Sequence, residues 1–328
     1  MSVSVRTGVR TRARLAAIGA HVPERVVTNR EIEGWVETSD EWIRTRTGIR
    51  ERRFAGAGEN ASDLAVRAAG RILADAGVEA ADIDVVIVPT STPDNVFPST
   101  AALVAHRIGA RHAAAYDLSA ACSGFVYGLA QAAGLVEGGI ARNVLVVGAE
   151  IMSRITDRTD RGTCILFADG AAGALVTAGD PEITTGFLGW DLGADGAGAD
   201  DLVAPVGGHM RMNGPEVFRF ATRVMVHSTE RLLDATGLGI EELDLVVAHQ
   251  ANSRILDHAC ERLGIPSDRV FSNIDRYGNT SAASVPLAMA EARDAGRLGP
   301  GDLLLLVAFG GGLTWASTIV RYEPAEAA

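Results

Sequence analysis

The sequence contains no lysine: all 30 residues counted as lysine or arginine are arginine. A Schiff-base aldolase, a pyridoxal-phosphate enzyme and a P-loop nucleotidase each need a lysine amine, so these three classes are excluded. Arginine remains as the cation for phosphate or carboxylate groups, to which its planar guanidinium group can make bidentate contacts. Because the formal net charge is −11, no nucleic-acid partner is expected, and any basic binding site must be local.

Cysteines and long apolar runs are also scarce. The three cysteines, Cys122, Cys164 and Cys260, lie far apart and form no CxxC pair, so neither a zinc site nor a disulfide framework is expected. No apolar run reaches the roughly 18 residues that a membrane-spanning helix needs, and the first residues lack the apolar core of a signal peptide. We therefore expect a cytoplasmic protein with no membrane association and with no metal or redox cofactor.

Short apolar runs alternate with segments of helical periodicity. Runs rich in Val, Ile and Leu, typical of strands covered on both faces, begin at Ile83, Asn143, Leu243 and Asp302. Helices are predicted between and around them near residues 62–76, 122–136, 216–235 and 283–296. This alternation indicates an α/β fold built in layers.

The spacing of these runs indicates an internal duplication. Ile83 and Leu243 lie 160 residues apart in similar surroundings, and Leu145 and Leu305 repeat the same interval. Two matching pairs at one interval predict two similar halves, which we place at residues 13–178 and 179–328. A stretch rich in Gly and Asp, residues 178–212, is expected to join them as turns and loop.

Chemistry-bearing residues are divided between the two halves. Cys122, in "DLSAACSGFVYGLA", reads either as a small buried hydrophobe or as a thiol whose pKa is lowered by a helix N-terminus. His249 follows a predicted strand, and Asn279 lies in "RYGNTSAAS"; taken singly, a core histidine and a turn asparagine are the ordinary interpretations. Because ligand sites in open α/β sheets gather at the carboxyl ends of strands, the three side chains could meet at the junction of the halves.

Together these residues form a set suited to acyl transfer. A thiolate forms a thioester readily and leaves from one readily, and a His with an Asn can stabilise a thioester enolate by two hydrogen bonds. The three glycines of "FGGGLTW" can approach a ligand closely and present backbone N–H groups to an oxyanion, although a tight turn after a strand would also explain them.

Six motifs give the chain its resemblance to the β-ketoacyl-acyl carrier protein synthase III family, thiolase-like condensing enzymes that start type II fatty-acid synthesis. The motifs are, in the family's order, "TSDEWIRTRTGIRERR", "AACSGF", "TDRGTCILFADGAAG", "HQAN", "GNTSAAS" and "FGGGLTW". The resemblance runs from about Ala13 to Tyr322, so residues 1–12 are taken as an N-terminal extension. It implies a thiolase-like, duplicated five-layer αβαβα fold with the nucleophile in the first half and His and Asn in the second.

The resemblance also implies a role for each site residue. Cys122 would be acylated by a starter acyl-CoA, His249 and Asn279 would assist malonyl decarboxylation and condensation, and the backbone N–H groups of Cys122 and Gly311 would hold the oxyanion. The implied CoA-binding residues are Thr38, Trp42, Arg46, Arg161 and Asn252. An indole face and an arginine can sandwich an adenine, which agrees with this assignment.

Two further contacts are implied by the resemblance. Arg219 and Arg254 would face the acyl carrier protein, and Phe97 would reach across a homodimer to close the partner's acyl pocket. The other two cysteines need no catalytic role, and Cys164 is expected to pack in a strand.

Alternative functions stay open at this stage. The chain could prime a polyketide pathway, or it could transfer an acyl group without forming a carbon–carbon bond, because the active set can be shared. A non-catalytic dimeric partner is a third possibility, although such a protein has no need of a reactive thiol. The starter acyl group is not determined by the motifs.

Overall fold

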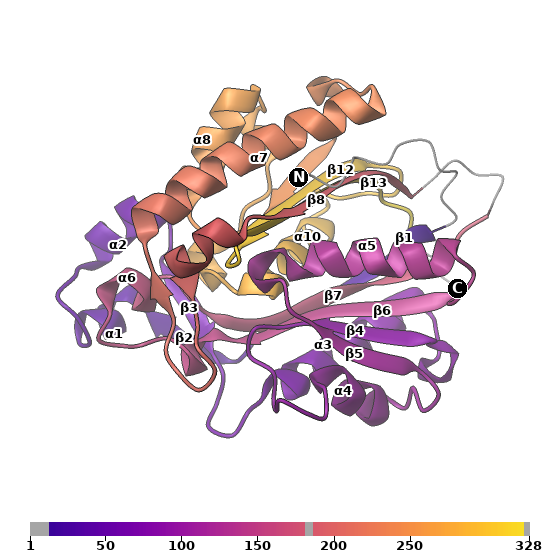
Figure 1. Cartoon of the computed structure of the whole chain (residues 1–328), viewed down its shortest axis with the longest axis horizontal. Coiled ribbons are helices and arrows are strands. Elements are labelled where there is room, and N and C mark those ends of the chain that lie inside the picture. Colours follow the sequence, from indigo (N-terminus) through magenta and orange to yellow (C-terminus); the bar gives the residue numbers. More distant parts are fainter. Residues whose placement is uncertain (1–12, 181–185, 325–328) are drawn as a thin grey trace.

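The computed structural model describes residues 13–180 and 186–324, and its elements form five layers around two sheets (Figure 1). The strands of the first sheet are, in spatial order, β1 (Ala13–His21), β7 (Asp169–Ala178), β6 (Asn143–Ile151), β4 (Val85–Pro89) and β5 (Ala114–Leu118). The strands of the second sheet are β11 (Leu245–Ala248), β12 (Leu303–Gly310), β13 (Thr314–Arg321) and β8 (Phe187–Ala194). This arrangement confirms the thiolase-like αβαβα fold that the resemblance implied.

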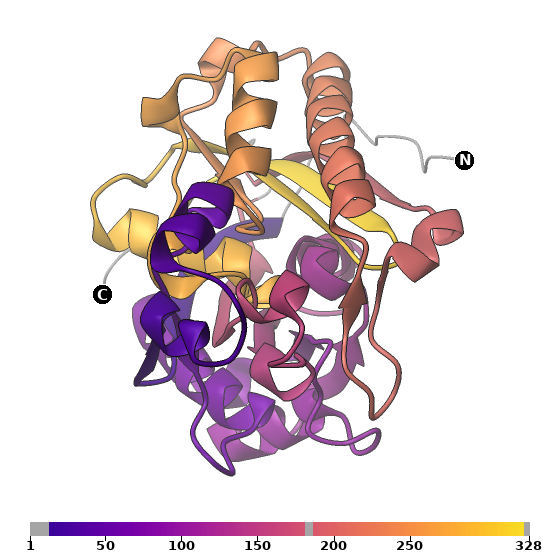
Figure 2. The ribbon, with the colours of Figure 1, turned by 90° about the vertical axis from the view of Figure 1, so that its left-hand side faces the viewer.

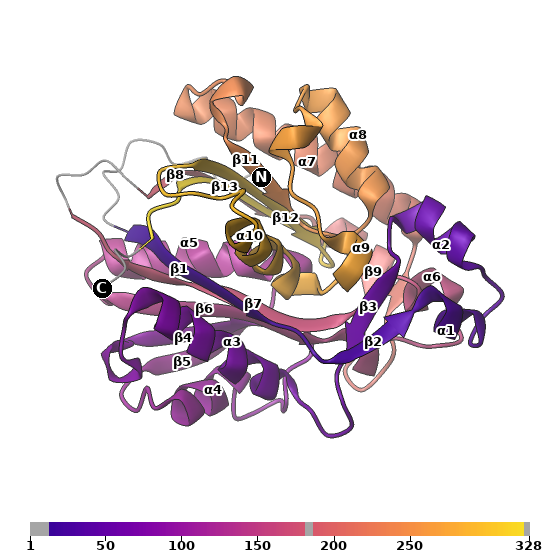
Figure 3. The same ribbon diagram turned by 180° about the vertical axis from the view of Figure 1, so that it is seen from behind.

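Helices fill the remaining three layers. The middle layer holds α5 (Gly124–Glu137) and α10 (Ser284–Asp294), which Figure 3 shows between the two sheets. The outer face of the first sheet carries α3 (Ala61–Ala76) and α4 (Thr100–Ile108), and that of the second carries α7 (Gly214–Thr236) and α8 (Ser253–Leu263). None of the helices in the described ranges has the length and apolar character needed to span a membrane.

Shorter elements gather at one end of the layered core (Figures 1 and 2). They are β2 (Arg25–Thr28), α1 (Asn29–Glu33), α2 (Asp40–Thr47), β3 (Glu51–Phe54), α6 (Arg161–Cys164), β9 (Leu202–Val203), β10 (Arg211–Met212) and α9 (Ile274–Tyr277). Helix α2 comes from the N-terminal part of the chain but contacts α8 of the second half. Cys164 is buried at the end of the short helix α6, so its predicted place in a strand was wrong.

The duplication is visible in the backbone as well as in the sequence. In each half a parallel strand pair, β4–β6 or β11–β12, is followed by an antiparallel strand, β7 or β13. Two residues with positive φ, Ala121 (45°) and Ser281 (49°), lie 160 residues apart. The carboxylates of Asp84 and Asp244, also 160 apart, accept equivalent N–H bonds from Asn143 (2.9 Å) and Leu303 (2.8 Å). The exact boundary at residues 178 and 179 stays a prediction, and residues 1–12 lie outside the described ranges.

The stretch predicted to join the halves also contains a strand. This strand, β8, pairs antiparallel with β13 and forms one edge of the second sheet. The glycines and aspartates of this stretch are typical of turns, and they interrupt the continuous apolar run by which the other buried strands were predicted. Asp191 of β8 is fully buried. Ser228, Arg231 and Trp315, all distant in sequence, donate hydrogen bonds to its carboxylate and so offset the cost of burying it.

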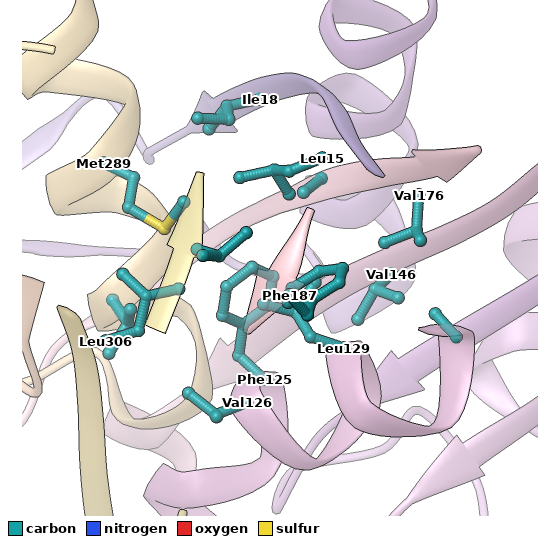
Figure 4. Close-up of a cluster of buried hydrophobic side chains, with 14 of the residues drawn as sticks. Leu15, Ile18, Phe125, Val126, Leu129, Val146, Val176, Phe187, Met289 and Leu306 are labelled. Carbon is teal, nitrogen blue, oxygen red and sulfur yellow. The ribbon is translucent and has the colours of Figure 1, made fainter. Parts of the chain in front are cut away.

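The middle helices join the halves through a shared apolar core (Figure 4). Phe125 of α5 is fully buried in a cluster that also contains Val146 of the first sheet, Leu306 of the second sheet and Met289 of α10. Burial of one such side chain contributes roughly 1.5–3 kcal/mol. Since α5 begins at Gly124, two residues after Cys122, this packing fixes Cys122 relative to both sheets.

Candidate active site

Cys122 lies in a 3₁₀ turn, Ala121–Ser123, between β5 and α5. The turn begins with Ala121 at φ 45°, a left-handed conformation that costs energy for a residue other than glycine and persists only when its surroundings hold it. The hydroxyl of Ser123 donates to the carbonyl of Ala120 (2.7 Å). The hydroxyl of Thr314 lies 3.1 Å from the same carbonyl and 3.1 Å from that of Gly311. The nucleophile turn is thus tied to the glycine loop of the other half.

The glycine loop approaches Cys122 more closely than any side chain would allow. A Cβ atom on Gly310 would lie 2.6 Å from the backbone nitrogen of Cys122 and 3.1 Å from its Cβ. Gly311 borders the same cavity as Cys122. This close approach explains the need for glycine and brings the backbone of both segments to one place.

Burial keeps the Cys122 thiol protonated in the free protein. The side chain is 5% exposed, and burial raises its pKa to about 12, with a further increase from the charge of Glu150 and a decrease from the hydroxyl of Ser281. The positive end of a helix is worth about 0.3–1 kcal/mol, less than one pKa unit. The lowered pKa considered from the sequence is therefore not found, because desolvation is the larger effect.

His249 is a buried imidazole that stays neutral and is held by Ser284. It follows β11, its backbone N–H donates to the carbonyl of Val307 (2.8 Å), and burial lowers its pKa to about 3. Its Nδ1 lies 2.5 Å from the hydroxyl oxygen of Ser284, which also accepts the N–H of Gln250 (3.3 Å). When the Ser284 hydroxyl donates to Nδ1, the hydrogen of the neutral ring lies on Nε2.

Asn279 is held by its own backbone and by Ser281. Its N–H donates to the carbonyl of Leu166 (2.9 Å), and its carbonyl accepts the N–H of Ala168 (2.9 Å). The side-chain Oδ1 accepts the N–H of Ser281 (2.9 Å). Because the amide oxygen is engaged in this way, the NH₂ group is the part of the side chain left for a ligand.

One cavity of about 820 Å³ brings the predicted residues of the two halves together. Cys122, His249 and Asn279 all line it, and all three are buried. The exposed arginines Arg46 and Arg161 line its outer part. The structure therefore joins the three chemistry-bearing side chains, which are separated in sequence, to a basic entrance.

An aromatic and cationic cluster forms this entrance. The guanidinium carbon of Arg161 lies 4.9 Å from the ring centroid of Trp42, and that of Arg46 lies 5.8 Å from it. Asn252 donates to the carbonyl of Arg46 (3.0 Å) and also accepts the backbone N–H of Arg254 (3.0 Å) at the start of α8. Thr38, the fifth residue predicted for this group, does not line the cavity.

The predicted carrier-protein residues lie at the same entrance. Arg219 and Arg254 both line the cavity and are exposed. Arg254 lies over the ring of Phe218, with 5.5 Å between the guanidinium carbon and the ring centroid, and Arg219 pairs with Glu216. Both guanidinium groups are therefore accessible from solvent at the cavity entrance.

A second cavity of about 400 Å³ also reaches Cys122. Its lining is mostly apolar and includes Met152, Ile155 and Met210, with Ser281 and Thr314 among its polar members. Phe97 lines neither cavity of its own chain: it is 85% exposed, as is the adjacent Val96.

Sequence reasoning missed the residues that support the three central side chains. Ser284 lies at hydrogen-bond distance from Nδ1 of His249, and Thr314 links the turn that carries Cys122 to the glycine loop. Both lie within motifs already noted, "GNTSAAS" and "FGGGLTW", but the motifs alone gave them no role. Only their long-range contacts show what they support.

The layered fold and a cysteine at the meeting point of its halves define a thiolase-like condensing enzyme. Two family models match the chain: "3-Oxoacyl-[acyl-carrier-protein (ACP)] synthase III" at residues 116–196 and the "C terminal" model of the same enzyme at residues 233–322. The β-ketoacyl-[acyl-carrier-protein] synthase III of Desulfitobacterium hafniense is 48% identical over 324 residues, with 94% of this chain and 97% of that protein covered.

Solved structures agree with this assignment. The β-ketoacyl-[acyl carrier protein] synthase III of Thermus thermophilus is 51% identical, with a TM-score of 0.90 and with 95% of this chain and 100% of that chain covered. The priming β-ketosynthase of the R1128 polyketide biosynthetic pathway is 37% identical, with a TM-score of 0.91 and with 98% and 99% covered. The chain belongs to the β-ketoacyl-[acyl-carrier-protein] synthase III family, the acyltransferases that initiate fatty-acid synthesis.

Proposed function

We propose that this chain catalyses the decarboxylative condensation of a starter acyl-CoA with a malonyl-acyl carrier protein through an acyl-Cys122 intermediate. The observation that carries the proposal is the convergence of a thiol, a neutral imidazole and a primary amide on one cavity with a Trp42–Arg161 entrance. The carrier protein named in the family's description is one partner, and acyl-CoA is the other substrate.

The first half-reaction transfers the acyl group to Cys122. We place the adenine of CoA between Trp42 and Arg161 at the entrance, where the Arg161 guanidinium, 4.9 Å from the Trp42 ring centroid, moves outward to admit it. Arg46 and Asn252 line the path inward. The sulfur of Cys122 attacks the thioester carbonyl, whose developing oxyanion is held by the backbone N–H groups of Cys122 and Gly311. The carbon–sulfur bond of the acyl-CoA breaks, and the proton of the Cys122 thiol ends on the departing CoA sulfur.

The second half-reaction forms the carbon–carbon bond. Loss of CO₂ from the malonyl thioester leaves an enolate, whose oxygen accepts hydrogen bonds from Nε2–H of His249 and from the amide NH₂ of Asn279. The enolate carbon attacks the acyl carbonyl, the bond to Cys122 breaks, and the released thiolate takes a proton from water. A neutral imidazole suits this step because it donates a hydrogen bond without needing to lose a proton.

The finer assignments complete the proposal. The acyl chain lies in the second cavity, and Arg219 and Arg254 contact the acidic carrier protein. A homodimer would cover the exposed Val96 and Phe97, with Phe97 closing the partner's acyl pocket. Thr38 is the weakest assignment for CoA, and a cytoplasmic location stays a prediction.

Intact-protein mass spectrometry tests the proposal directly. The protein is mixed with a panel of acyl-CoAs, and malonyl-acyl carrier protein is then added. We expect one acyl mass on Cys122 that disappears on addition of the malonyl carrier as a ketoacyl carrier forms, and no acyl mass on a Cys122→Ala variant. A ketoacyl product made by Cys122→Ala would overturn the proposal.

A second function is supported by the likeness to the R1128 priming ketosynthase. Such an enzyme could carry out the same chemistry but pass its product to a polyketide pathway. The two are distinguished by product analysis with fatty-acid and polyketide carrier proteins offered in competition. An acylated Cys122 that the malonyl carrier leaves untouched would instead indicate acyl transfer to another acceptor, and a chain that gains no acyl mass would be a non-catalytic partner.

A further inference from the structure

Glu150 is a fully buried carboxyl group behind the active site, and the mechanism above does not use it. It lies near the end of β6, in the half of the chain that carries Cys122. The backbone N–H of Ser91 (3.0 Å) and the hydroxyl of Thr92 (2.8 Å) donate to Oε2, and the hydroxyl of Thr90 lies 3.4 Å from it. These donors belong to the loop that follows β4, so Glu150 fixes that loop to the end of β6.

The same carboxyl group faces the Asn279-bearing segment of the other half. A Cβ atom on Gly148, two residues earlier in β6, would lie 2.5 Å from the carbonyl oxygen of Ala282, so strand and turn are in direct contact. The Ser281 hydroxyl and the Ala282 N–H both lower the pKa of Glu150, which burial raises. The Ser281 hydroxyl also lowers the pKa of Cys122. Because side chains two residues apart in a strand lie on the same face, the Glu150 side chain lies on the face of β6 that contacts this turn.

Ser281 connects this buried carboxyl group to the reaction. Its backbone N–H donates to Oδ1 of Asn279 (2.9 Å), which orients the amide. Ser281 is only 1% exposed, has φ of 49°, and its hydroxyl oxygen has no partner at hydrogen-bond geometry among the described residues. A residue held in this conformation depends on its surroundings, and the buried Glu150 side chain is part of them.

We propose that Glu150 is a positioning residue for the condensation step: it anchors the Ser281–Ala283 turn from the opposite half and thereby fixes the Asn279 amide that binds the enolate oxygen. The inference rests on the proposed function of Asn279. A carboxyl group has enough lone pairs to accept hydrogen bonds from the Ser91–Thr92 loop and from the turn together. Because acylation of Cys122 does not use Asn279, Glu150 is needed chiefly in the second half-reaction.

The test separates the two half-reactions in Glu150→Ala and Glu150→Gln variants. Acylation is followed by intact-protein mass spectrometry with the starter acyl-CoA alone, and condensation is followed on pre-acylated protein after addition of malonyl carrier. Glu150→Ala should slow condensation by about 10- to 100-fold while acylation stays within about threefold. Glu150→Gln should restore most of the condensation rate, because its amide oxygen still accepts from Ser91 and Thr92 and its NH₂ can donate to the Ser281 hydroxyl.

Matched controls keep the experiment decisive. Glu137→Ala and Glu137→Gln change a half-buried carboxyl group at the far end of α5 and should leave both half-reactions unchanged. If Glu150→Ala does not fold, Glu150→Asp, which retracts the carboxyl group by one methylene, should show the same selective loss. Equal loss of both half-reactions, no loss of either, or a Glu150→Gln variant as impaired as Glu150→Ala would overturn the inference. A wild-type protein that is not acylated at all would instead overturn the proposed function.

Discussion

Condensation by this protein should not depend on deprotonating His249 anywhere between pH 5 and 8. Burial lowers the pKa of His249 from the ordinary 6.5 to about 3. This difference of about 3.5 pKa units corresponds to about 5 kcal/mol in favour of the neutral ring. At pH 5 an imidazole with a pKa of 6.5 is about 97% protonated, whereas one with a pKa of 3 is about 1% protonated. The proposed Nε2–H donor and its Nδ1 acceptor should therefore persist throughout this range.

The assay is the single-turnover rate constant for condensation on pre-acylated protein at saturating malonyl carrier, measured at intervals from pH 5 to 8. We expect a profile without an inflection near 6.5. A rate constant that falls about 25-fold between pH 7 and 5, with an apparent pKa near 6.5, would refute the neutral-donor mechanism. Ser284→Ala provides the matching structural test: loss of the hydroxyl that donates to Nδ1 releases the tautomer, so condensation should slow about tenfold at every pH.

Further predictions concern the thiol, the entrance, the glycine loop and the acyl cavity. Alkylation of Cys122 by iodoacetamide should rise about tenfold per pH unit from pH 7 to 10, because burial holds its pKa at about 12, and a plateau near pH 8 would contradict this. Trp42→Ala should raise KM for acyl-CoA about tenfold and leave single-turnover condensation unchanged, because about 1–2 kcal/mol of stacking is lost; steady-state and single-turnover kinetics check both parts. Gly310→Ala should slow acylation at least about 100-fold, since its Cβ would lie 2.6 Å from the Cys122 nitrogen, and acylation at the wild-type rate would show that the close approach is not needed. Acyl groups larger than acetyl should load onto Cys122, because the second cavity has a volume of about 400 Å³, roughly that of 13 waters, and can hold a longer chain. Loading of acetyl alone in a mass-spectrometric panel would contradict this.

Local pattern was sufficient for the broad architecture. Continuous apolar runs identified β4, β6, β11 and β12, because strands covered on both faces are apolar along their whole length. The 160-residue interval predicted two similar halves, which the matching backbone conformations of Ala121 and Ser281 confirm. Strand β8 escaped the same reasoning, since its glycines and buried Asp191 acquire their meaning only from partners far away in the chain.

The residue types of the site could be predicted for a similar reason. A cysteine before a helix, a histidine after a strand and a triple-glycine loop are short-range features, and the family motifs add Asn279. Their meeting on one cavity follows from the duplicated topology, which brings the corresponding ends of both sheets together.

The sequence by itself thus determined the layered class of fold and the duplication, and it predicted the thiol, imidazole and amide that the structure places on one cavity. Only the tertiary structure decided the protonation of these side chains and the long-range contacts that hold them in place. The pKa of Cys122 and that of His249 depend on desolvation, which is a property of the packed molecule. Thr314 lies 191 residues from Ser123, its hydrogen-bond partner, and Gly148 of β6 contacts Ala282 in a turn of the opposite half. Such contacts form when the two halves pack together, so no local pattern contains them.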